Sequence, residues 1–324
     1  MIKIKDLKKY YSKEKKTVRS IDGVSLEIYP GETLGLVGES GCGKSTVAKC
    51  LLGLTPPSAG SIEYKSKSLT ELKGSSLKSF RHETAMIFQD PYASLNPRMT
   101  AADIISEPIE IHKLLRGAEK KRRLDQLLDL VGLPKTSKTR FPHEFSGGQK
   151  QRIGIARALA TNPRLIVCDE PISALDVSVQ AQIINLLKQL QKEMGLTYLF
   201  IAHDLRIVKY LSDRVAVMYL GQIMEVAPAK QLYESPMHPY TQALLSSIPI
   251  PDPIIEKKRS RIILRGEVPS PLDPPKGCPF ATRCPHATPT CHHVRPALKE
   301  ISPGHKAACH LLGEIKQPLF SLSK

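Results

Sequence analysis

The feature that most constrains this chain is the run Gly38-Glu39-Ser40-Gly41-Cys42-Gly43-Lys44-Ser45-Thr46, which matches G-x-x-x-x-G-K-[ST] at every fixed position. An apolar run, residues 33–37, precedes it, and a helix-compatible run, residues 46–52, follows it. Glycines accept the backbone angles that closely spaced N–H groups require, and the helix adds the positive end of its dipole. The loop is therefore predicted to bind phosphate, with Lys44 on the β- and γ-phosphates and the Ser45 hydroxyl on Mg²⁺.

Length and composition set the broad class of the protein. The 324 residues have room for roughly two compact units. We expect a soluble or peripheral protein, because no apolar run approaches the roughly 20 residues of a membrane span and the first residues lack a signal-peptide core. Seven cysteines without a C-x-x-C pair are typical of reduced cytosolic thiols. A net charge of +16 favours an anionic partner, nucleic acid or an acidic membrane face, but it also fits a solvated surface.

Two carboxylates and one amide follow apolar runs that are typical of buried strands. Residues 165–168 read as a central parallel strand, and the carboxyl end of such a strand is where these sheets place ligands. Asp169 would hold Mg²⁺ there, and Glu170 would polarise the attacking water. Gln89 follows another apolar run, and its side-chain carbonyl could ligate Mg²⁺.

Two helices begin with residues suited to an anion site. Ser146-Gly147-Gly148-Gln149 forms a second Gly-rich helix start. One phosphate chain needs only one Gly-rich binding loop. This second segment would therefore be redundant in a monomer, but in a dimer it could act on the nucleotide of the other subunit. Asp176 precedes a long amphipathic helix, predicted over residues 177–194.

A histidine and an aromatic residue complete the candidate site. His203 follows the apolar run 196–201, at the same expected end of the sheet as the phosphate loop, and is predicted to contact the γ-phosphate. The pair Tyr10-Tyr11 lies near a lysine-rich loop. One of these rings could stack on a purine, or it could pack against the sheet.

Taken in their order along the chain, from the phosphate loop through Gln89, the Ser146 segment, the acid pair and Asp176 to His203, these features resemble those of the ATP-binding subunits of ABC transporters. The resemblance implies a head-to-tail dimer in which the Ser146 signature of one subunit completes the ATP site of the other. It implies that Glu170 is the general base, that His203 senses the γ-phosphate and that Tyr11 stacks on adenine. The implied ATP- and Mg²⁺-binding residues are Tyr11, Gly38, Ser40, Gly41, Cys42, Gly43, Lys44, Ser45, Thr46, Gln89, Ser146, Gly147, Gly148, Gln149, Asp169 and Asp176.

The expected fold class is α/β, with a P-loop NTPase (RecA-like) core, an antiparallel β subdomain, an inserted α-helical subdomain and a small Cys-rich, metal-binding C-terminal extension. The ATPase domain would span residues 1–248, with its helical subdomain at about 90–160. Prolines recur between residues 249 and 275, so residues 249–276 are predicted to be a linker. Residues 277–324 would form the extension.

The tail resembles that of the oligopeptide and dipeptide permease branch, through Ser235-Pro236-Met237-His238-Pro239-Tyr240-Thr241-Gln242-Ala243-Leu244-Leu245 and Gly266-Glu267-Val268-Pro269-Ser270-Pro271. This implies an ATPase that powers peptide uptake through two transmembrane permease subunits, at the cytoplasmic face of the cell membrane. A second ATP-binding subunit, identical or related, would complete the pair, and an extracytoplasmic peptide-binding protein would supply the cargo. Residues 101–133 and the Gln89 segment would face the permeases.

Four cysteines near the end of the chain, Cys278, Cys284, Cys291 and Cys309, form a candidate ligand set. In the peptide-permease branch a similar pattern binds an iron–sulfur cluster, so [4Fe-4S] ranks first, zinc second, and free thiols or disulfides last. Because so small a unit needs a cross-link to be stable, the metal would have a structural role.

Three other interpretations stay open at this point. The first is a soluble nucleic-acid-associated ABC ATPase using the positive charge. Such proteins usually carry two cassettes or a long coiled-coil insertion, and this chain shows neither, so no nucleic-acid partner is predicted. The second is an importer of another cargo such as nickel. The third is a metal-dependent regulatory or redox module.

Overall fold

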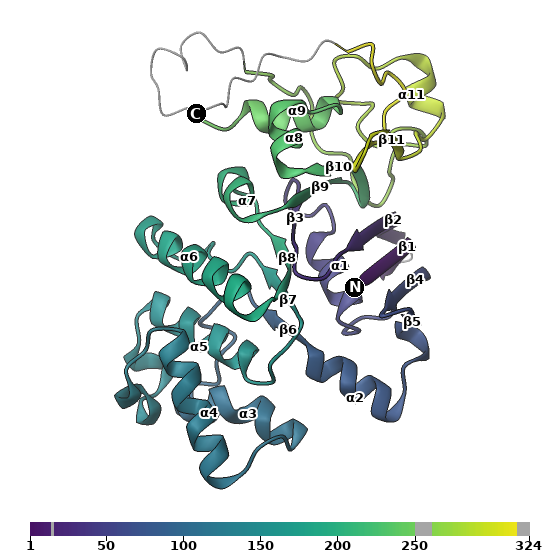
Figure 1. The fold of residues 1–324 in the computed structure, drawn as a ribbon. Helices are drawn as coiled ribbons and strands as arrows, with labels where there is room; N and C mark the ends of the chain where they lie inside the picture. The colour runs from purple at the N-terminus through teal and green to yellow at the C-terminus, as the bar shows by residue number, and fades with distance from the viewer. Residues whose placement is uncertain (14–15, 250–260, 316–324) are drawn as a thin grey trace. The chain divides into compact units, whose positions relative to one another are not determined.

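The computed structural model describes residues 1–13, 16–249 and 261–315. Figure 1 shows the order of its helices and strands. The chain divides into two compact units, each described by itself below. The first comprises Met1–Glu27, Leu34–Thr70 and His203–Lys324, and the second comprises Ile28–Thr33 and Glu71–Ala202. Among the described helices, none combines the length and the apolar content that a bilayer crossing would need.

The first unit begins with a four-stranded sheet in the order β2-β1-β4-β5. Its strands are β1 (Ile2–Lys13), β2 (Lys16–Ile28), β4 (Ala59–Tyr64) and β5 (Lys67–Ser68), and β4 pairs antiparallel with β1 and β5. Apolar side chains of β1 are buried at Ile2, Ile4 and Leu7. The step of three residues from Ile4 to Leu7 coincides with a register shift between Lys5 and Lys8. The predicted antiparallel subdomain is therefore present.

A second group of strands in this unit carries the phosphate loop. β3 (Thr33–Val37) pairs parallel with β9 (Arg214–Tyr219), which pairs antiparallel with β10 (Gln222–Pro228). Two strands from the end of the chain, β12 (His305–Ala307) and β11 (Lys299–Ser302), continue the same sheet beside β10. The C-terminal extension is thus hydrogen-bonded into the unit that contains the phosphate loop. The helical elements of this unit are α1 (Lys44–Leu51), η1 (Leu69–Glu71), α7 (Leu205–Leu211), α8 (Ala229–Glu234), α9 (Pro239–Ser246) and α11 (Pro289–His293).

The second unit contains three parallel strands and a group of helices. β7 (Leu165–Asp169) lies between β6 (Thr84–Ile87) and β8 (Thr197–Ile201). Every residue of β7 and β8 is buried, as their continuous apolar runs predict. The helical elements are α2 (Gly74–Glu83), α3 (Ala101–His112), α4 (Gly117–Leu130), η2 (Lys135–Thr139), η3 (Pro142–Glu144), α5 (Gly147–Leu159) and α6 (Val177–Met194). Figure 1 shows α3, α4 and α5 gathered together, and each pair of them is in contact.

Within the predicted helical subdomain, residues 101–130 form two helices, because Lys113 ends α3 in the left-handed conformation (φ 56°) and Gly117 begins α4 with φ 52°. One local expectation differs from the structure. The lysine-rich segment predicted as a loop is in strand conformation from Lys16 onwards, at the start of β2. Of the predicted linker 249–276, residues 250–260 lie outside the described part of the chain, as do residues 316–324 of the predicted extension.

Candidate functional site

The phosphate loop joins β3 to α1 through three glycines with positive φ. Gly38 (φ 153°) and Gly43 (φ 105°) are also closely surrounded: a Cβ at Gly38 would lie 2.1 Å from the Met218 carbonyl oxygen, and one at Gly43 would lie 2.3 Å from the Ser20 carbonyl oxygen. No L side chain fits either position without movement of backbone. The fixed glycines of the motif are therefore required both by their conformation and by the space around them.

Lys44 is only 5% exposed, and its ammonium group points back into the loop. Nζ donates hydrogen bonds to the carbonyl oxygens of Gly38 (2.8 Å) and Glu39 (3.1 Å). α1 begins at Lys44 with no side-chain cap and no acidic residue in its first turn. A cation and a positive helix end therefore meet in a Gly-rich loop, which is the arrangement that binds phosphate groups.

The other residues of the motif surround this cation. Ser40 and Gly41 are exposed, Cys42 and Gly43 are buried, and Ser45 and Thr46 are half-buried. The hydroxyls of Thr46 and Ser20 lie 2.8 Å apart. Burial raises the pKa of the Cys42 thiol, although nearby Lys44 opposes the effect. The Cys42 thiol is therefore uncharged at neutral pH, so Cys42 lines the loop and does not act as a nucleophile.

Two further candidates of this unit lie outside the loop. Tyr11 is 40% exposed, and the Lys9 ammonium lies 5.0 Å from its ring centroid. Packing does not cover this ring, so it is accessible for stacking. His203 is exposed and precedes α7, whose first turn is capped by the Asp204 carboxylate accepting from the Arg206 backbone N–H (2.8 Å).

In the second unit, Asp169 and Glu170 lie at the carboxyl end of β7, as the sequence predicts. Asp169 is 7% exposed at the end of β7. Glu170 turns away from the strand with φ 48°, and its N–H donates to the Ile201 carbonyl. The Gln89 amide donates to the Glu170 carboxylate at 3.0 Å. The structure thus brings Gln89 against the candidate general base, a contact that neither residue's local sequence indicates.

The signature segment is the N-terminus of α5. The Ser146 hydroxyl accepts from Gln149 N–H, and the Gln149 side chain accepts from Ser146 N–H (3.1 Å), so the two residues form a capping box. A Cβ at Gly148 would lie 2.5 Å from the Val179 side chain on α6. This close contact favours glycine at the second residue of α5. Asp176 is exposed at the N-cap of α6.

The predicted metal site at Cys278, Cys284, Cys291 and Cys309 is not supported. Across residues 1–13, 16–249 and 261–315, no three His, Cys, Asp or Glu side chains are placed to hold a metal ion. Burial raises the pKa of Cys278 to about 12 and that of Cys284 to about 11. None of these four cysteines forms a disulfide.

Two histidines of the extension bind other groups of the protein. His305 pairs with the buried Glu225 carboxylate (Nε2 to Oε1, 2.7 Å), and His310 Nε2 lies 2.8 Å from the Val294 carbonyl oxygen. Neither the [4Fe-4S] cluster nor zinc is therefore assigned to the extension.

Comparison with known proteins identifies the family of this chain. The family described as "ABC transporter" matches residues 21–173, and the family described as "Oligopeptide/dipeptide transporter, C-terminal region" matches residues 224–291. The putative oligopeptide transport ATP-binding protein YkfD of Bacillus subtilis (strain 168) is 59% identical over 314 residues, which cover 96% of this chain and 95% of the relative. This chain is an ABC transporter ATP-binding subunit. It belongs to the oligopeptide/dipeptide branch of these ATPases.

Two further comparisons agree with this family. The oligopeptide transport ATP-binding protein OppF of Escherichia coli (strain K12) is 52% identical over 307 residues, covering 94% of this ABC subunit and 92% of OppF. Among solved structures, the ATP-binding cassette MJ0796, a dimer in a post-hydrolysis state bound to ADP and Pi, superposes with a TM-score of 0.65 and 29% identity. That match covers 71% of this chain and 99% of MJ0796, so the P-loop ATPase fold is established.

Proposed function

We propose that this ABC subunit hydrolyses ATP to power the uptake of dipeptides or oligopeptides. The observation that carries the proposal is the buried Lys44 ammonium in a Gly-rich loop at the start of α1, which is suited to the β- and γ-phosphates. The peptide cargo rests on the names of YkfD and OppF, both described as oligopeptide transport proteins.

The predicted site residues have the following roles in this proposal. The Mg²⁺ ion would be bound by Ser45, Gln89 and Asp169. Tyr11 would stack on adenine. Glu170 is the general base, and His203 contacts the γ-phosphate. Residues 146–149 and Asp176 act on the ATP of a second subunit. Mg²⁺ would neutralise charge on the phosphates.

The proposed partners are two transmembrane permease subunits and a second ATP-binding subunit, identical or related. An extracytoplasmic peptide-binding protein would deliver the cargo. The chain would then lie at the cytoplasmic face of the membrane as a peripheral protein. The family resemblance supports these partners, and no nucleic acid is among them.

Glu170→Gln tests the catalytic part of the proposal. The variant should bind Mg-ATP with wild-type affinity but hydrolyse it at least about 100-fold more slowly, because the neutral amide cannot accept the proton of water. The matched control is Glu234→Gln, at an exposed acid at the end of α8, which should keep wild-type turnover. Wild-type hydrolysis by Glu170→Gln would remove Glu170 from this role.

A reconstituted transporter tests the cargo. Vesicles containing both ATPases and both permeases should accumulate labelled tripeptide only with ATP and the binding protein. Accumulation of Ni²⁺ in place of peptide would show that the nickel alternative is correct.

A further inference from the structure

Glu39, a variable position of the phosphate-loop motif, is held by several groups at once. Its N–H donates to the Tyr240 hydroxyl (3.0 Å), and its carbonyl oxygen accepts from Lys44 Nζ (3.1 Å) and from Cys42 N–H (3.3 Å). Glu39 therefore contacts both Tyr240 and the Lys44 ammonium group that is proposed to bind phosphate.

The Glu39 carboxylate is bound by an arginine from the C-terminal extension. Arg283 Nη1 lies 3.0 Å and 2.8 Å from the two carboxylate oxygens, and the side chains of Arg283 and Glu39 are 10% and 26% exposed. The two residues are 244 positions apart in the sequence. A partly buried ion pair of this kind is screened by water and salt much less than an exposed one.

Aromatic side chains fix the position of this arginine. The rings of Tyr219, Tyr240 and Phe280 pack together with centroids 4.7 to 5.5 Å apart. Arg283 N–H donates to the Phe280 carbonyl (3.0 Å), and its guanidinium carbon lies 5.9 Å from the Tyr219 ring centroid. The guanidinium is therefore held at Glu39 by packed neighbours.

We propose that Arg283 is a positioning residue for nucleotide binding, which neutralises Glu39 and thereby lets the loop accept a polyphosphate. This proposal rests on the phosphate loop being the ATP site. A carboxylate in a loop that binds a highly charged anion repels that anion, and the repulsion grows with the number of phosphates. Through Arg283, the C-terminal extension sets the affinity of the ATPase for ATP.

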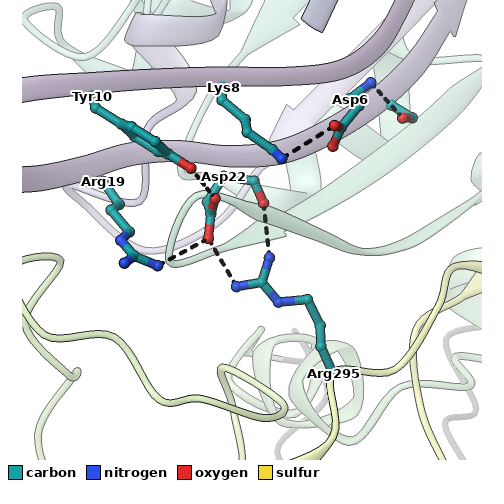
Figure 2. A network of polar contacts seen from close by, with 7 residues as sticks. Asp6, Lys8, Tyr10, Arg19, Asp22 and Arg295 are labelled. Atoms are coloured by element: carbon teal, nitrogen blue, oxygen red, sulfur yellow. Dashed lines mark hydrogen bonds and ion pairs between the residues drawn. The ribbon is translucent and has the colours of Figure 1, made fainter. Parts of the chain in front are cut away.

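A second ion pair of the extension provides a matched control. Figure 2 shows Asp22 of β2 between Arg295, Arg19 and Tyr10. Arg295 Nη2 lies 2.8 Å from the Asp22 carboxylate, and the Tyr10 hydroxyl donates to it at 2.5 Å. None of these four residues belongs to the phosphate loop, so removal of Arg295 weakens an anchor of the extension without changing the charge at Glu39.

The test measures dissociation constants for ATP, ADP and AMP by calorimetry on the full chain with Mg²⁺. Arg283→Gln should weaken ATP binding about tenfold, ADP binding less and AMP binding within about twofold, because the repulsion scales with ligand charge. Glu39→Gln alone should bind ATP at least as tightly as wild type, and Glu39→Gln/Arg283→Gln should recover wild-type affinity within about threefold. Arg295→Gln should stay within about twofold for all three nucleotides.

Opposite outcomes would overturn the proposal. If Glu39→Gln weakens ATP binding as much as Arg283→Gln does, or if Arg295→Gln matches Arg283→Gln, the ion pair is only a structural anchor. Should Arg283→Gln fail to fold, the Glu39→Gln result still decides, because a loss of ATP affinity there contradicts the charge argument. Lys44→Ala distinguishes failure of the ATP site from failure of the role of Arg283. If Lys44→Ala still binds ATP, the proposed ATP site is wrong. If Lys44→Ala loses ATP binding while Arg283→Gln keeps wild-type affinity, only the role of Arg283 is refuted.

Discussion

His238 gives this ATPase a stability that depends on pH. The ring is 1% exposed at the N-cap of α9, where Nδ1 accepts from Tyr240 N–H (3.0 Å), and its centroid lies 5.8 Å from that of Phe280. Burial lowers the pKa of His238 from 6.5 to about 4, although the nearby Glu225 carboxylate favours the protonated ring. The folded protein therefore keeps this ring neutral at pH values where the unfolded chain would protonate it.

The sign and size of the effect follow by linkage. Between pH 6.5 and pH 4 the unfolded chain binds the proton and the folded chain does not, so the free energy of unfolding falls as the pH falls. At about 1.4 kcal/mol for each pH unit, the contribution of His238 amounts to roughly 3 kcal/mol. It is fully present above pH 6.5 and is lost at about pH 4.

His238→Asn removes the titration but keeps a side chain that can cap α9. Urea unfolding followed by circular dichroism, which needs no tryptophan, should give a free energy for wild type that falls by roughly 3 kcal/mol more than that of the variant between pH 7 and pH 4. Hydrogen exchange at the backbone amides of α9, measured at the same pH values, tests whether the loss of stability includes the helix that His238 caps. Parallel pH profiles for wild type and variant would refute the reasoning, whatever the difference in their absolute stabilities.

Two pairs of substitutions test local structure. Gly41→Ala and Gly43→Ala both place a side chain at positive φ, which costs about 1–2 kcal/mol, but only at Gly43 does the Cβ meet backbone, 2.3 Å from the Ser20 carbonyl oxygen. Urea unfolding should therefore show a clearly larger loss for Gly43→Ala, and equal losses would contradict the packing argument. Thr100→Ala should lower the free energy of unfolding by about 1 kcal/mol, because it removes the side chain that caps α3 by accepting from Asp103 N–H. Thr100→Ser keeps the cap and should behave as wild type, and a loss equal to that of Thr100→Ala would show that the hydroxyl does not act as the cap.

Features that depend on neighbouring residues follow from the amino-acid sequence. The glycines around Lys44 permit the positive φ angles of the loop, Ser146 and Gln149 cap α5 across three positions, and the apolar run before Asp169 predicts a buried strand. Each of these is set within one turn of helix or a few residues of strand. The P-loop ATPase fold could therefore be predicted from the amino-acid sequence, whereas the roles of the candidate site residues stay predictions.

Contacts between distant residues depend on how the chain packs. Arg283 reaches Glu39 across 244 positions and Arg295 reaches Asp22 across 273, and neither arginine differs in sequence from the many solvated cations of this basic chain. The four C-terminal cysteines were likewise expected to hold a metal, but among the described residues no three His, Cys, Asp or Glu side chains are placed to hold one. Local sequence fixes backbone conformation, but burial and ion pairing depend on the packing of the whole unit.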